Sequence, residues 1–197
     1  MNDFLARTQE GAAALRRAVT IKTRPQLLAS VREEPAVGAG VIAGAIGQVE
    51  KARTLTRPSV LGVAAVTASH AAYAWSLYRR GARNDALGWG LRAAVWGAGV
   101  AATRKEPTAA AVAVGGAAVL TTSAVAGDPA LRTDAGKGIS HGANLLVAAE
   151  GLTALRAALA QQYRGKRKQR ARLVGAAEAG ALAVGHLLLL DGLRRTR

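Results

Sequence analysis

The sequence predicts an all-α, polytopic membrane protein of about six transmembrane helices, and three observations support this prediction. Two runs without a charged residue, 58–78 and 107–127, are each 21 residues long. A helix of that length crosses the roughly 30 Å hydrocarbon core of a bilayer. Short basic links separate them from four other apolar stretches, which are 35–49, 86–103, 138–160 and 173–193. Alanine (47 residues) and glycine (23 residues) dominate these stretches, whereas strands favour β-branched and aromatic residues.

Three of the six stretches contain isolated charges. Arg92 lies in the third, Glu150 and Arg156 in the fifth, and Glu178 and Asp191 in the sixth. The mean hydropathy of +0.14 is low for a membrane protein. We attribute it to alanine-rich spans and to the basic links between them. The alternative from another class is a soluble alanine-rich helical bundle.

The first 34 residues differ from the rest of the chain. Apolar and small residues form one helical stripe there, with basic residues elsewhere; the stripe comprises Leu5, Thr8, Ala12, Leu15 and Val19. This pattern predicts an amphipathic helix in the membrane interface over residues 1–34 and a transmembrane domain over residues 35–197. Because the segment lacks the apolar core of a signal peptide, we expect a multi-pass protein of the cytoplasmic (inner) membrane.

The net charge of +15 comes from 27 Lys and Arg residues against 12 Asp and Glu residues. The basic residues are dispersed among the links and fit no nucleic-acid-binding motif, so we expect membrane lipids rather than nucleic acid as partners. The Lys and Arg residues divide almost evenly between the two sides of a six-span bundle, which leaves the orientation in the membrane open. The densest cluster, residues 164–172, is a topology signal or a site for anionic headgroups through Lys166, Arg167 and Lys168.

Polar side chains inside apolar stretches are the candidates for function, because burying them in a membrane is costly. We expect His70, Glu150 and Asn144 to be the catalytic candidates, in a water-containing cavity. Further residues are expected to line this polar cavity, namely Gln48, Tyr73, Ser123, His141, Glu178 and His186. Hydrogen bonding between helices is the alternative role for the three histidines. Their spacing forms no compact ligand motif, so no metal or other cofactor is expected.

Two further patterns have a structural and a functional interpretation. Trp89, Arg92 and Trp96 share one helical stripe, which anchors a helix at the interface or binds a lipid phosphate through Arg92. A proline followed 11 residues later by Ser-His occurs before both His70 and His141. This spacing indicates either an inverted three-span repeat, as in several transporters, or chance in a low-complexity chain.

Small residues at helical spacing predict close helix packing. The positions concerned are Gly40, Gly44, Gly97, Gly115 and Gly116. Small residues allow helix backbones to approach closely in a membrane. The same Gly and Ala faces could also pair two copies of the chain in a homo-oligomer.

Five short segments between about residues 20 and 160 resemble the lysoplasmalogenase family. Ser69-His70-Ala-Ala-Tyr73 is similar to the family's Gly-His-x-x-Tyr span, and Lys22-Thr-Arg-Pro25 to its Thr-Lys-Pro segment. Gln48 and Ser123 fall where the family has an Asp, in Gly-Asp-Val and Ser-Asp segments respectively, and Asn144 falls in its Ala-Gln segment.

The resemblance implies a bundle of about eight helices that hydrolyses the vinyl ether bond of lysoplasmalogens. That reaction needs an acid that protonates the enol ether carbon. Gln48 and Ser123 cannot replace the family's carboxyl groups in this role. Either Glu150, Glu178 or a histidine takes over the role, or the chain is a diverged member without the activity. We expect the latter, and hence no measurable vinyl ether hydrolysis. The alternatives are a small transporter-like protein and a structural lipid-binding membrane protein without catalysis.

Overall fold

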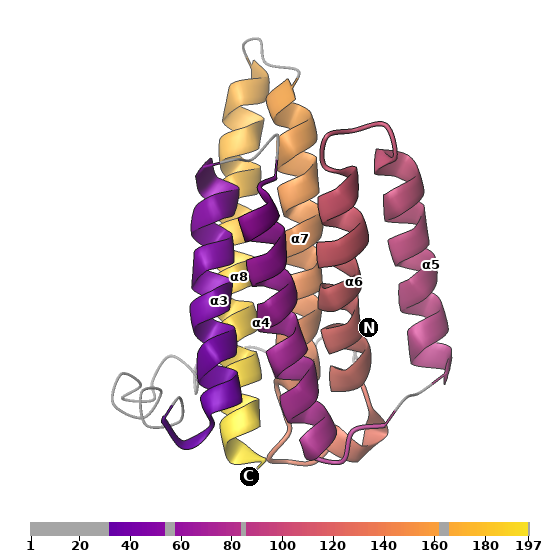
Figure 1. The fold of residues 1–197 in the computed structure, drawn as a ribbon, viewed down its shortest axis with the longest axis vertical. Coiled ribbons are helices and arrows are strands. Elements are labelled where there is room, and N and C mark those ends of the chain that lie inside the picture. Colours follow the sequence, from indigo (N-terminus) through magenta and orange to yellow (C-terminus); the bar gives the residue numbers. More distant parts are fainter. Residues whose placement is uncertain (1–31, 54–57, 84–85, 162–165, 197) are drawn as a thin grey trace, which may run out of the picture.

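The computed structural model describes residues 32–53, 58–83, 86–161 and 166–196, and these form an antiparallel helical bundle (Figure 1). Its helices are α3 (Pro35–Arg53), α4 (Val60–Arg79), α5 (Ala86–Thr103), α6 (Ala109–Ala126), α7 (Ile139–Gln161) and α8 (Lys166–Arg195), with a short 3₁₀ helix η1 (Pro129–Leu131) before α7. The described residues contain no strand. The all-α prediction is therefore confirmed, and the six expected stretches correspond to six helices. The interfacial helix expected over residues 1–34 falls outside the described residues, apart from 32–34.

Three of the six helices are long and apolar enough to cross a membrane. They are α4, α6 and residues 173–195 of α8. By the same measure, applied to the residues that the structure describes, α3, α5 and α7 are not, and the latter two contain charged residues near their middle. The expected six spans are thus supported by length and composition for three helices.

The expectation that residues 164–172 form a link is wrong in part, because α8 begins at Lys166. Lys and Arg favour helices almost as strongly as Leu does, so a basic run continues a helix without difficulty. The basic cluster therefore occupies the first two turns of α8.

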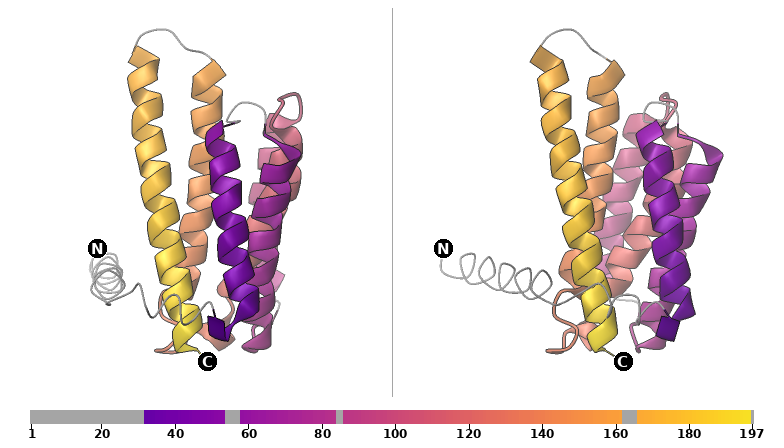
Figure 2. Two further views of the ribbon diagram at one scale, coloured as in Figure 1. Left: turned by 60° about the vertical axis from the view of Figure 1, so that its left-hand side comes forward. Right: turned by 90° about the vertical axis from the view of Figure 1, so that its left-hand side faces the viewer.

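The helices pack in an order that differs from their order in the sequence. Contacts run from α3 to α4, from α4 to α6, from α6 to α7 and from α7 to α8, while α5 packs against α6 at the edge of the bundle (Figures 1 and 2). The largest fully buried apolar side chains lie where α4, α6, α7 and α8 meet; they include Tyr73, Leu77, Val125, Leu146 and Leu189.

Two glycines of α3 allow its backbone to approach α4 closely. A Cβ on Gly44 would lie 2.9 Å from the Ser69 Oγ of α4, and one on Gly40 would lie 3.0 Å from Cβ of Ala72. The expected close packing is confirmed for these two glycines. It is wrong for Gly97 and Gly115, where an added Cβ meets nothing within 4 Å.

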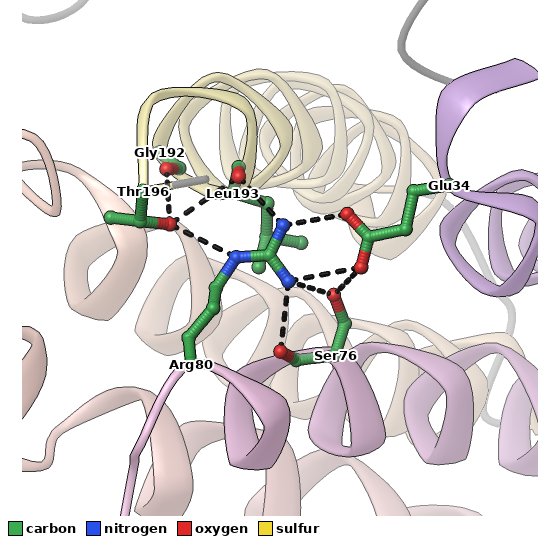
Figure 3. A network of polar contacts seen from close by, with 6 residues as sticks. All are labelled: Glu34, Ser76, Arg80, Gly192, Leu193 and Thr196. Carbon is green, nitrogen blue, oxygen red and sulfur yellow. Dashed lines mark hydrogen bonds and ion pairs between the residues drawn. The ribbon is translucent and has the colours of Figure 1, made fainter.

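A network of polar contacts around one ion pair joins three helices at one end of the bundle (Figure 3). Arg80, just after α4, pairs with Glu34 before α3 at 2.6 Å. The same guanidinium donates to the carbonyl of Leu193 at 2.9 Å and to the hydroxyl of Thr196 at 3.1 Å, both at the end of α8. Ser76 donates to Glu34 and accepts from Arg80. Arg80 therefore ties the start of α3 to the ends of α4 and α8, and we call this network the Arg80 clamp.

The outer surface of the bundle is apolar, whereas charges within the helices point inward. Large exposed apolar side chains occur on every one of the six helices, for example Ile42, Leu61, Leu91, Val114, Leu155 and Leu173. Among the described side chains of the six helices α3 to α8, exposed charges occur only at helix ends, at Arg53 and Arg79. A helix at a protein–water surface normally has the opposite arrangement, with charges on its outer face.

Candidate functional site

An apolar cavity of about 390 Å³ lies between α4, α5, α6 and α7. Side chains of moderate size and several glycines form its walls; they include Val63, Val66, Val95, Trp96, Gly99, Val112, Gly116, Val119, Val147 and Gly151. Hydroxyl groups of Ser59, Thr103 and Thr108 are found where the cavity reaches the helix ends. Its volume is at the lower end of the range of about 300–1,000 Å³ typical of small-molecule sites.

Lys51 and Glu150 form an ion pair on the wall of this cavity. Lys51 comes from the last turn of α3 and Glu150 from the middle of α7. Their side chains are 16% and 25% exposed, so both are held inside the bundle. They are the only charged groups among the described lining residues, and together they contribute no net charge.

A second, more polar groove of about 500 Å³ runs between α3 and α8. Gln48, Glu178 and His186 line it, as does Lys51, which therefore borders both hollows. Glu178 is 3% exposed and receives a hydrogen bond from Thr153 at 2.7 Å. It also pairs with Arg156 of α7 at 2.9 Å. Lys51 with Glu150 and Arg156 with Glu178 thus form two compensated ion pairs inside the bundle.

Two of the histidines lie on either side of Tyr73. The rings of His70 and Tyr73 meet edge to face with centroids 5.9 Å apart, and those of Tyr73 and His186 with centroids 6.0 Å apart. His70 Nδ1 is 3.1 Å from the Thr122 hydroxyl, which in turn donates to the His70 carbonyl. His186 Nδ1 lies 2.9 Å from the carbonyl of Leu182. Both imidazoles therefore have partners within the bundle.

Arg92 points toward the interior rather than toward the surface. Its Nε donates to the Ser123 hydroxyl at 2.9 Å, and the Ser123 hydroxyl donates to the side-chain oxygen of Asn144 at 2.6 Å. Trp96 donates to the carbonyl of Ala113 and lines the apolar cavity. These contacts connect α5, α6 and α7, and they involve Arg92 in helix packing.

The structure does not bring the three catalytic candidates into one cavity. Glu150 lines the apolar cavity, His70 is buried against Thr122, and Asn144 contacts Ser123. Gln48, Glu178 and His186 do share the groove between α3 and α8. Tyr73 and Ser123 are buried. The basic residues Lys166, Arg167 and Lys168 belong to α8, and their side chains are outside the described part of the structure.

The recurring Pro and Ser-His spacing does not mark equivalent positions. His70 is buried in the middle of α4, whereas His141 is exposed in the first turn of α7. The difference arises because η1 and a link separate Pro129 from α7, while Pro58 lies directly before α4.

Two residues at the site, Lys51 and Arg156, were not identified as candidates from the sequence. Lys51 follows Glu50 and precedes Arg53, so it has the appearance of a solvated link residue, yet α3 continues to Arg53. Arg156 was noted only as an isolated charge. The available signal was the presence of opposite charges in largely apolar stretches, which allows Lys51 to pair with Glu150 and Arg156 with Glu178.

Within the described residues, no three His, Asp or Glu side chains gather in a way that could hold a metal ion. Comparison of the chain with protein-family models, with curated proteins and with solved structures finds no match. Any assignment of function therefore depends on the geometry of the bundle.

Proposed function

We propose that the chain is a multi-pass protein of the cytoplasmic (inner) membrane that holds a single-chain lipid in the cavity between α4, α5, α6 and α7. The membrane location is supported by the apolar outer surface and the inward-facing charges. In this arrangement α3, α5 and α7 complete a six-span bundle around the three most apolar helices, and their polar groups face protein rather than lipid.

The apolar cavity is the observation that carries the proposed ligand. Apart from Lys51 and Glu150, its described lining is uncharged, and most of it is aliphatic. Such a lining favours a hydrocarbon chain, because burial of apolar surface supplies the binding energy. The resemblance to lysoplasmalogenases, whose substrates are single-chain lipids, agrees with this ligand class. Near the end of the bundle the hydroxyl groups of Ser59 and Thr103 already donate to Glu50 and to the carbonyl of Gly99, so they offer a ligand acceptor oxygens, beside the hydroxyl of Thr108.

We further propose that the protein binds such lipids without cleaving the vinyl ether bond. Glu150 and Glu178, two of the carboxylates inside the bundle, each accept from a basic side chain. An ionised carboxylate is an acceptor only and has no proton for the enol ether carbon. Ser123, at one of the family's carboxyl positions, is engaged by Arg92 and Asn144.

The test is retention of an alkenyl lysophospholipid by purified protein in detergent, followed by native mass spectrometry. We expect Val112→Trp to reduce retention at least about tenfold, because Val112 lines the cavity and the indole would fill it. Val114→Trp is the matched control, since Val114 lies on the same helix and is 52% exposed on the outer surface.

The same samples are assayed for release of the glycerophospho-alcohol, and none is expected. Equal retention by Val112→Trp and Val114→Trp would contradict lipid binding in the cavity. Headgroup release that is lost in Glu150→Gln or His70→Ala would contradict the absence of hydrolysis.

A second candidate is a small transporter. It is favoured by the position of Lys51 between two hollows of different polarity, and by the Arg80 clamp, which joins helices at one end. Flux of lipid or solute in proteoliposomes would distinguish a transporter from a binding protein that only holds its ligand.

A further inference from the structure

Lys51 has an environment unlike that of the other lysines whose side chains the structure describes. Lys105 and Lys137 are exposed in links, whereas Lys51 is inside the bundle. Its side chain lines the apolar cavity on one side and the polar groove on the other. A primary amine at the wall of an apolar cavity is positioned to meet a reactive group at the end of a bound hydrocarbon chain.

The charge balance of the cavity restricts the end group of that chain. Lys51 and Glu150 compensate each other, and no other charged residue is found among the described lining residues. A charged group inside the cavity would therefore lack a counter-charge, which is costly in an apolar environment, so a phosphate headgroup would have to stay outside the cavity. A small uncharged polar group is favoured, and an aldehyde is the uncharged group that reacts directly with a lysine amine.

We propose that Lys51 captures a long-chain aliphatic aldehyde as an imine. The reaction joins the lysine nitrogen to the aldehyde carbon and releases one water molecule, with no change in oxidation state. The inference rests on the proposed function, because it uses the same cavity for the chain. It goes further by naming an uncharged carbonyl ligand and a covalent bond to a specific residue.

Glu150 provides the proton transfers that this condensation needs. It accepts a proton from the Lys51 ammonium, which frees the amine to attack the aldehyde carbon. It then returns the proton to the hydroxyl group of the resulting carbinolamine, which leaves as water. This oxygen is far more basic than an enol ether carbon, so a proton taken from Lys51 serves the condensation without enabling vinyl ether hydrolysis. The product is a positively charged iminium beside an ionised Glu150, so the ion pair is preserved from reactant to product. The water can leave through the groove between α3 and α8, which Lys51 also lines.

The experiment uses the full-length protein in lipid nanodiscs with hexadecanal as the probe. Sodium cyanoborohydride reduces any imine to a stable amine, and peptide mapping by mass spectrometry locates the adduct. We expect one adduct per chain, on Lys51. Lys51→Arg keeps the positive charge beside Glu150 and should abolish this adduct, whereas Lys105→Arg should leave it unchanged. Glu150→Gln should slow its formation by about 100-fold, the lower range for general acid–base catalysis.

Binding of hexadecanol, a chain of the same length that cannot form an imine, separates this inference from the proposed function. If hexadecanol binds and is excluded by Val112→Trp but no adduct forms on Lys51, the inference fails and the proposed function stands. If neither probe binds, both fail. Adducts spread over Lys105 and Lys137 at the same rate in the wild type and in Lys51→Arg would also overturn the inference.

Discussion

Replacement of Arg80 by glutamine is expected to destabilise the bundle by about 3 kcal/mol, the lower range for removal of one partner of a buried ion pair. The side chains of Arg80 and Glu34 are only 10% and 15% exposed. Without Arg80, Glu34 would keep its charge in a place that is poorly accessible to water. The carbonyl of Leu193 and the hydroxyl of Thr196 would also lose a donor.

Thermal unfolding of the purified protein in mild detergent measures this effect. Arg79→Gln is the matched control, because Arg79 is the preceding residue, has the same charge and is exposed. A second change, Glu34→Gln in the Arg80→Gln background, should recover part of the stability by removing a poorly hydrated charge that has lost its guanidinium partner. Equal midpoints for Arg79→Gln and Arg80→Gln would show that the clamp contributes nothing to stability.

Replacement of Gly142 by alanine is expected to cost about 1–3 kcal/mol, as overpacking typically does, and more if α7 and α8 must separate. A Cβ at Gly142 would lie 2.6 Å from the carbonyl oxygen of Gly185 and 2.6 Å from the backbone nitrogen of Leu189. Both are backbone atoms of α8, so no side-chain rotation can relieve the contact.

Gly151→Ala is the control in the same helix. An added Cβ at Gly151 meets nothing within 4 Å, and alanine favours the helix by about 1 kcal/mol over glycine. The two Gly→Ala changes should therefore shift the unfolding midpoint in opposite directions. A neutral or stabilising Gly142→Ala would contradict the close contact between α7 and α8.

The helices were predictable from sequence because their signal is local. The uncharged runs 58–78 and 107–127 became α4 and α6 with shifts of one or two residues, and residues 86–103 match α5. The start of α8 was missed because its basic residues resemble a link in composition, although they favour a helix. Charge therefore marks the end of an apolar run and not the end of a helix.

The candidate site was predictable only in part, because it depends on contacts between distant residues. Glu150 was recognised as an isolated charge in an apolar helix, but its partner Lys51 lies 99 residues earlier. That pairing requires the last turn of α3 to come within side-chain reach of α7, although the two helices are not packed against each other. The order of packing, in which α4 contacts α6 and α5 lies at the edge, has no signal in a single sequence. For the same reason Arg92 was expected at the membrane interface, as part of a helix anchor or at a lipid phosphate, although it contacts Ser123 of α6.

The apolar outer surface of the bundle is expected to face lipid, and the absence of cysteine from the sequence allows a direct test. Single cysteines are introduced at Arg83, Pro107, Val114 and Ala130, all exposed in the structure, and are labelled in intact membrane vesicles with a membrane-impermeant maleimide. The account predicts that Arg83→Cys and Ala130→Cys react from one side of the membrane and Pro107→Cys from the other. Val114→Cys should react only after the membrane is dissolved in detergent. Rapid labelling of Val114→Cys without detergent, together with labelling of the other three from the same side, would contradict the membrane-spanning bundle and favour a soluble one.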